Sequence, residues 1–92
     1  MMTKITIKHG RVKTLLCEGH AKNSLVCGVI STLCVAWQAY YEGSGRKPLK
    51  VDIREGYTLI KFRGKAREFE VVETALRLLA ENYPADCDIQ IM

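Results

Sequence analysis

Hydrophobic and polar residues alternate at the start of the chain. Ile5 and Ile7 lie between lysine and threonine residues, and this period of two indicates a half-buried strand. His9 and Gly10 then supply a turn, and residues 12–17 form a second apolar segment. We therefore predict a β-hairpin, with His9 as a residue of its turn.

From Leu25 the spacing of apolar residues changes from two to three or four. The apolar positions of this segment are Val26, Val29, Ile30, Leu33, Trp37 and Tyr40. Such spacing predicts a helix with one buried face. Ser24 is expected to be the N-cap, and Gly43, with the Ser-Gly that follows, is expected to end the helix.

The second half of the chain repeats this succession. Residues 49–54 alternate in hydrophobicity, Glu55-Gly56 supplies a turn, and residues 57–62 return as a fourth strand. A second amphipathic helix has its apolar stripe at Phe69, Val72, Leu76, Leu79 and Tyr83. Pro84 ends this helix, and residues 87–91 form a last strand.

The predicted order of elements is thus ββαββαβ. An α+β fold of two layers, with both helices on one face of a largely antiparallel sheet, would bury every apolar stripe. A chain of 92 residues is expected to form one domain over residues 1–92.

The composition of the chain limits where in the cell the protein is expected and which classes of partner it is expected to bind. The first residues lack the apolar core of a secretory signal, and no uninterrupted apolar run reaches the roughly 18 residues needed to cross a bilayer. We therefore expect a cytoplasmic protein, without membrane contact, whose cysteines are reduced thiols. The net charge of +4 comes from dispersed basic residues, so nucleic-acid binding is not favoured. A small RNA-binding domain is the weakest alternative.

Candidate chemistry lies where the second strand gives way to the first helix. With Ser24 as N-cap, Cys27 lies in the first turn, where unpaired N–H groups and the helix dipole favour an anion. The thiolate is the reactive form of cysteine. His20, at the end of the preceding strand, is within reach as a general base and acid. The N–H groups of Cys27 and Gly28 are candidate donors to an oxyanion.

The other reactive side chains have simpler explanations. Inert packing is expected for the remaining thiols, Cys17, Cys34 and Cys87, and core packing for Trp37. A zinc site is not expected, because Cys27 and Cys34 are separated by about 10 Å along one helix. No metal or other cofactor is predicted.

Two segments resemble the signature of the ribosomal-processing cysteine proteases, the Prp (YsxB-like) family. They are Gly19-His20-Ala21 and Leu25-Val26-Cys27-Gly28-Val29-Ile30-Ser31. The resemblance extends over nearly the whole chain. It implies that Cys27 and His20 form a catalytic dyad, with Gly19, Gly28 and Ser24 as loop or oxyanion support. It also implies a homodimer and removal of an N-terminal extension from a ribosomal large-subunit protein.

Two features depart from the family pattern. The step from His20 to Cys27 is shorter than is usual in the family, and Ser24 stands where the family has an aspartate. The helix start survives this exchange because Ser and Asp are both good N-caps, whereas any orienting contact of the aspartate does not. A short loop also leaves less chain to fold over a substrate. The alternative function is therefore a weak or inactive binding module that docks on a ribosomal or other protein. A different substrate, such as a phage structural precursor, would also suit the divergence.

Overall fold

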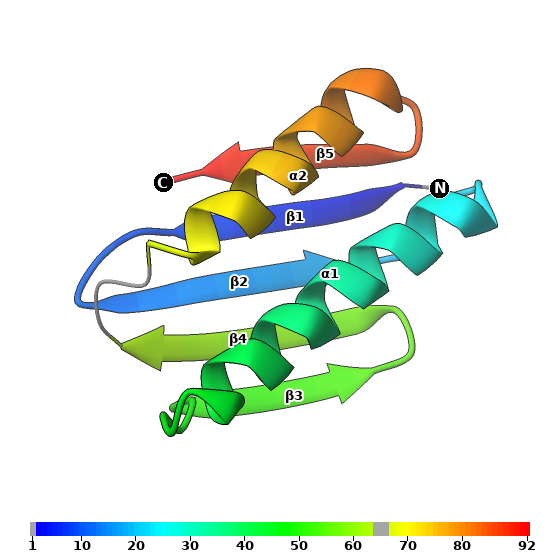
Figure 1. The fold of residues 1–92 in the computed structure, drawn as a ribbon. Helices are drawn as coiled ribbons and strands as arrows, with labels where there is room; N and C mark the ends of the chain where they lie inside the picture. The colour runs from blue at the N-terminus through cyan, green and yellow to red at the C-terminus, as the bar shows by residue number, and fades with distance from the viewer. Residues whose placement is uncertain (1, 64–66) are drawn as a thin grey trace.

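The computed structural model describes residues 2–63 and 67–92, and within them the predicted order of elements is confirmed (Figure 1). The strands are β1 (Thr3–Lys8), β2 (Val12–Glu18), β3 (Lys50–Arg54), β4 (Tyr57–Arg63) and β5 (Cys87–Ile91), and the helices are α1 (Ser24–Gly43) and α2 (Phe69–Asn82). Met1 and residues 64–66, which the one-domain prediction includes, lie outside the described residues.

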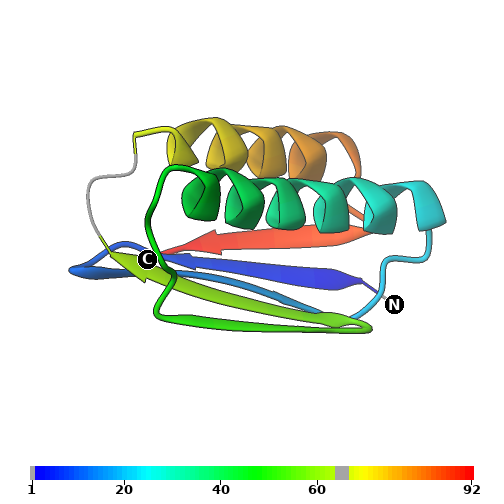
Figure 2. The same cartoon turned by 60° about the horizontal axis from the view of Figure 1, so that its bottom comes forward.

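The strands form one sheet in the order β3-β4-β2-β1-β5. β1 is antiparallel to β2, and β4 is antiparallel to both β2 and β3. β5 instead pairs with β1 in parallel, because α2 carries the chain across the sheet before β5 begins. Both helices lie side by side on one face of the sheet (Figure 2), which confirms the predicted α+β architecture.

The core lies between the helices and the sheet. The sheet contributes Ile5, Ile7, Leu15, Ile60 and Phe62. The helices contribute Val26, Ile30, Cys34, Trp37, Tyr41, Phe69 and Leu76. The Trp37 ring packs against Phe62 and Phe69, with centroids 5.0 and 5.1 Å away, which confirms its predicted place in the core.

The start of α1 corrects one prediction. The N-cap is Asn23 rather than Ser24, because the Asn23 side chain accepts the Leu25 N–H at 2.9 Å. The Asn23 N–H in turn donates to the carboxylate of Asp86, in the loop before β5, at 2.9 Å. Ser24 is therefore the first helical residue and Cys27 the fourth. The contact with Asp86 favours Asn23 over its neighbour, since both residue types cap helices well.

α1 also corrects the expectation that no segment is apolar enough to cross a membrane. Its 20 residues pass that test by length and composition, with a hydropathy of 1.3. A few polar residues, Ser31, Thr32 and Gln38 among them, interrupt the apolar runs of α1 without making the helix polar, so a count of uninterrupted runs misses it. In the structure one side of α1 is packed on the sheet, while Leu25, Val29 and Val35 are exposed on its other sides.

Candidate active site

Gly19 fixes the backbone that leads from β2 to His20. Its φ is +88°, and a Cβ at this position would lie 2.7 Å from the carbonyl oxygen of Met2. Its N–H donates to the carbonyl oxygen of Gly56 at 2.9 Å, which joins this loop to the β3–β4 turn. Only glycine fits both the left-handed conformation and the close approach to Met2.

The sulfur of Cys27 lies half-buried at the edge of the core, one turn into α1. The Ala21 N–H donates to this sulfur at 3.0 Å, and the Ala21 carbonyl oxygen lies 3.5 Å from it. The sulfur therefore has a main-chain donor and a main-chain acceptor of the same residue beside it. Ala21 is itself buried, so this donor is held in place. Its role was not predicted, and its only sign in the sequence is an apolar residue within a polar loop.

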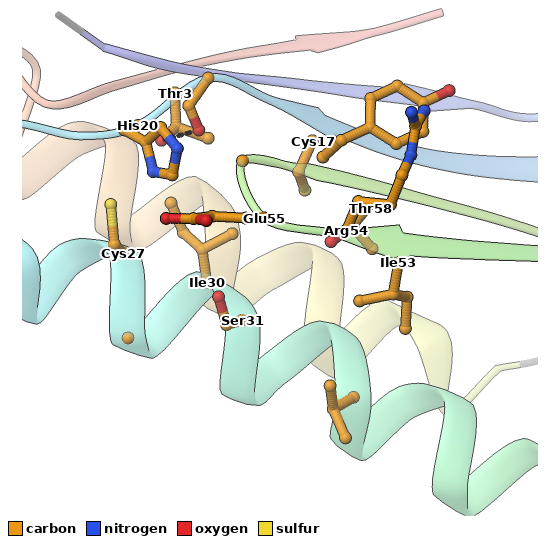
Figure 3. A pocket seen from close by; sticks show the side chains of 15 residues that line it. Thr3, Cys17, His20, Cys27, Ile30, Ser31, Ile53, Arg54, Glu55 and Thr58 are labelled. Carbon is orange, nitrogen blue, oxygen red and sulfur yellow. Dashed lines mark hydrogen bonds between the residues drawn. The ribbon is translucent and has the colours of Figure 1, made fainter.

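His20 lines the same pocket as Cys27 (Figure 3). The ring lies against the β3–β4 turn, since a Cβ on Gly56 would lie 2.6 Å from the His20 Nε2. The hydrogen bonds of Cys27 within the described residues go to Ala21 and Asn23, and none goes to His20. The fold therefore brings the two predicted residues into one pocket without a direct bond between them. Catalytic hydrogen bonds are often long before substrate binds.

The pocket has a volume of about 300 Å³ and is open to solvent. It is lined by Cys27, Gly28, Ile30, Ser31 and Val35 of α1, by residues 53–58 of the β3–β4 hairpin, and by Thr3, Cys17, Gly19 and His20. This volume is at the lower end of the range for ligand sites. An open pocket of this size suits part of an extended chain rather than an enclosed small molecule.

The N–H group of Cys27 is not free to bind an oxyanion. It donates to the carbonyl oxygen of Asn23 at 3.2 Å, as the first main-chain hydrogen bond of α1. This corrects the sequence-based expectation, and the cause is the shift of the N-cap from Ser24 to Asn23. Gly28 lines the pocket and has open space where a Cβ would lie, whereas Ser24 is exposed outside the pocket. Their supporting roles stay predictions.

Matching solved structures include three that cover nearly the full length of the chain. The S. aureus ribosomal processing protease Prp in complex with a substrate peptide has a TM-score of 0.79 and 15% identity, over 99% of this chain and 100% of that chain. The same protease in complex with a covalently linked product peptide has a TM-score of 0.83 and 17% identity, over 99% of this chain and 100% of that chain. The chain has the Prp fold.

SMU.848 from Streptococcus mutans has the Prp-like architecture as well, with a TM-score of 0.78 and 22% identity over 100% of this chain and 98% of that chain. No protein-family model and no curated protein matches the sequence. The resemblance to Prp drawn from two short segments is thus confirmed at the level of the fold.

The other thiols are buried, which confirms their predicted packing role. The sulfur atoms of Cys17 and Cys34 lie 3.7 Å apart between β2 and α1. The hydrogen bond with Cys34, together with burial, raises the pKa of Cys17 far above its ordinary value. Burial, helped by the adjacent Asp86 and Asp88, also raises the pKa of Cys87. The same contact with Cys17 lowers the pKa of Cys34. All three thiols are nevertheless buried and out of reach of a substrate, in contrast to the half-buried Cys27, which lines the pocket.

Proposed function

We propose that this chain is a cytoplasmic cysteine endopeptidase that removes an N-terminal extension from a ribosomal large-subunit protein or a similar precursor. The observation that carries the proposal is the placement of Cys27. Its sulfur lies at the positive end of α1, accepts a main-chain N–H from Ala21 at 3.0 Å, and shares an open pocket with His20. This is the environment that makes a thiol nucleophilic.

The proposed reaction uses the two side chains in turn. The Cys27 thiol gives its proton to His20, and the sulfur attacks the carbonyl carbon of the scissile peptide bond. The C–N bond then breaks as the His20 imidazolium returns the proton to the departing amine, which leaves a thioester on Cys27. Water hydrolyses the thioester after giving a proton to His20, and that proton finally restores the Cys27 thiol.

The Prp structure with a covalently linked product peptide supports this assignment, because a covalent product is what a nucleophilic mechanism leaves on its enzyme. That protease is also seen with a substrate peptide. The open pocket of this chain suits a segment of peptide in the same manner. The precursor itself is proposed from the resemblance of the two sequence segments.

The decisive experiment replaces one thiol at a time. Cys27→Ala is expected to lower kcat/KM by at least about 10⁴-fold on a ribosomal large-subunit precursor that carries its extension, as loss of a nucleophile does. Cys34→Ala, on the same helix, is the matched control and is expected to cleave at nearly the parental rate. Mass spectrometry of the products gives the rate and the position of the cut. Equal cleavage by Cys27→Ala and the parent chain contradicts the proposal.

A second candidate is a binding module without activity. It is favoured by the separation of His20 from Cys27, since neither residue bonds to the other within the described chain. It predicts that the parent chain binds the precursor, by calorimetry, and leaves it intact. Cleavage that depends on Cys27 excludes it.

We also propose that the chain forms a homodimer through its helical layer. A shallow apolar hollow between α1 and α2 is lined by Val29, Leu33, Ala75, Leu78, Leu79, Asn82 and Tyr83. None of the described residues that line it is charged, which suits a self-complementary interface. Light scattering is expected to give twice the 10.4 kDa chain mass. Leu78→Asp should halve that mass, and Val71→Asp, exposed on α2 outside the hollow, should not.

A further inference from the structure

The tip of the β3–β4 hairpin places a carboxylate at the proposed active site. Among the described residues that line the pocket, only Glu55 carries a carboxylate. Figure 3 shows its side chain extending from the turn toward the side of the pocket where His20 and Cys27 lie. The ion pairs of the described chain involve Glu73 and Asp52 instead, so the Glu55 carboxylate has no cation of its own there.

The turn that carries Glu55 is held against His20. Gly56, the next residue, has φ of +70°, and its backbone touches the imidazole so closely that a Cβ would lie 2.6 Å from Nε2. The carbonyl oxygen of Gly56 also accepts the Gly19 N–H at 2.9 Å, one residue before His20. The positions of residues 55 and 20 are therefore coupled through two contacts of the backbone.

The neighbouring cation does not neutralise Glu55. The guanidinium of Arg54 lies 3.2 Å from the Asp52 carboxylate and 4.5 Å from the centroid of the Tyr57 ring. Asp86, the acidic residue nearest the start of α1, accepts the Asn23 N–H. The first turn of α1 carries no acidic residue. Glu55, in contrast, has no side-chain hydrogen bond or ion pair within the described residues.

We propose that Glu55 is the positioning residue for His20, a role that rests on the proposed peptidase function. When Cys27 gives up its proton, His20 becomes a cation beside a thiolate. A carboxylate on the adjoining turn then holds the imidazolium in place and stabilises the charged pair, as the acidic member of a catalytic triad does. Glu55 itself neither touches the scissile bond nor transfers a proton.

The test compares Glu55→Gln with Glu55→Asp and with Glu18→Gln. Glu18 is exposed on β2 outside the pocket, so its substitution removes the same charge without reaching His20. Glu55→Gln is expected to lower kcat about 10-fold while KM stays near its parental value. The effect is smaller than the roughly 10⁴-fold loss for a buried triad carboxylate because Glu55 is exposed. Glu55→Asp should recover part of kcat, and Glu18→Gln should match the parent.

A second measurement needs no substrate. Alkylation of Cys27 by iodoacetamide at neutral pH, followed by mass spectrometry, is expected to slow in Glu55→Gln and to stay unchanged in Glu18→Gln. A parental kcat and alkylation rate in Glu55→Gln overturns the inference, and so does a rise in KM alone, which indicates contact with substrate. If Cys27→Ala and His20→Ala still abolish cleavage, the proposed function survives that failure.

Discussion

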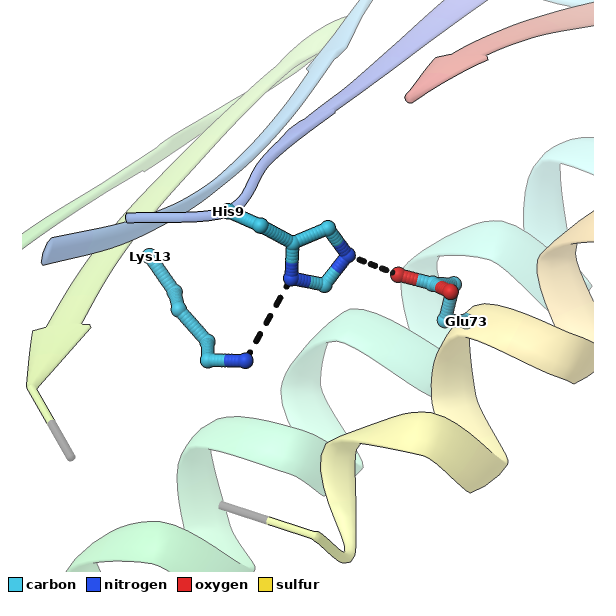
Figure 4. Close-up of polar contacts among 3 residues, drawn as sticks. All are labelled: His9, Lys13 and Glu73. Carbon is cyan, nitrogen blue, oxygen red and sulfur yellow. Dashed lines mark hydrogen bonds and ion pairs between the residues drawn. The ribbon is translucent and has the colours of Figure 1, made fainter. Parts of the chain in front are cut away.

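The two histidines of this chain lie at opposite ends of the sheet and differ in their hydrogen bonds. His9, after β1, has both ring nitrogens engaged: Nε2 lies 2.6 Å from the Glu73 carboxylate and Nδ1 lies 3.3 Å from the Lys13 ammonium (Figure 4). His20, after β2, lies against Gly56 at the edge of an open pocket. No side-chain hydrogen bond of His20 is present within the described residues.

This difference separates a structural histidine from one available for chemistry. Lys13 has only donors, so Nδ1 of His9 accepts and Nε2 carries the proton toward Glu73. The ring therefore joins the β1–β2 hairpin to α2 and has no free nitrogen for a substrate. α1 repeats the contrast in its thiols, because Cys34 is paired with Cys17 in the core while Cys27 faces the pocket. In both pairs, the group that faces the pocket is the one without a side-chain partner among the described residues.

In the comparison of the two histidines, the largest expected effect comes from exchanging each for alanine in turn. His20→Ala removes the proposed base and is expected to lower kcat/KM by about 10³-fold or more. His9→Ala should leave kcat/KM within about 2-fold and lower the free energy of unfolding by about 1 kcal/mol, the scale of a side-chain hydrogen bond. Peptide cleavage and urea unfolding measure the two effects. If both variants have a similar kcat/KM, His20 is not the base and the two histidines do not differ in function.

A smaller effect on kcat/KM is expected from substitution of Gly56, whose backbone lies against the His20 ring. Gly56→Ala adds about 1–2 kcal/mol of backbone strain at positive φ, together with a Cβ 2.6 Å from Nε2. The ring must move, so kcat/KM should fall about 10-fold. Gly45→Ala is the matched control, because Gly45 has φ of +86° and open space around it. Gly45→Ala should lower the free energy of unfolding by the same backbone strain, while its kcat/KM stays at the parental value. If both variants cleave at the parental rate, Gly56 does not fix the position of the His20 ring.

The sequence predicted the elements because each strand and helix carries its own local period. Ile5 and Ile7 alternate with polar residues in β1, and the apolar residues around Trp37 in α1 and around Leu76 in α2 recur at helical spacing. These periods do not depend on other parts of the chain. Contacts between distant segments could not be read in this way. Asp86 selects Asn23 as the N-cap across 63 residues, and Gly56 meets His20 from another hairpin. Local patterns therefore named Cys27 and His20 as candidates, whereas the long-range contacts around them could not be predicted from the sequence.

The smallest expected effect concerns the partnered thiols, and it appears only at high pH. Cys17 keeps its proton in the folded state because its pKa is raised by Cys34 and by burial, whereas in the unfolded chain it ionises near the ordinary value of 9.0. The unfolded state then binds fewer protons, so the stabilising contribution is present below pH 9.0 and is lost as pH rises above it. The loss attributable to Cys17 should approach about 1.4 kcal/mol per pH unit. Urea unfolding between pH 8 and 10.5 measures the slope. Because the same contact lowers the pKa of Cys34, the two thiols titrate as a pair, and replacing both with alanine should flatten the slope. A slope unchanged by the double substitution would mean that the buried pair does not hold a proton in the folded state.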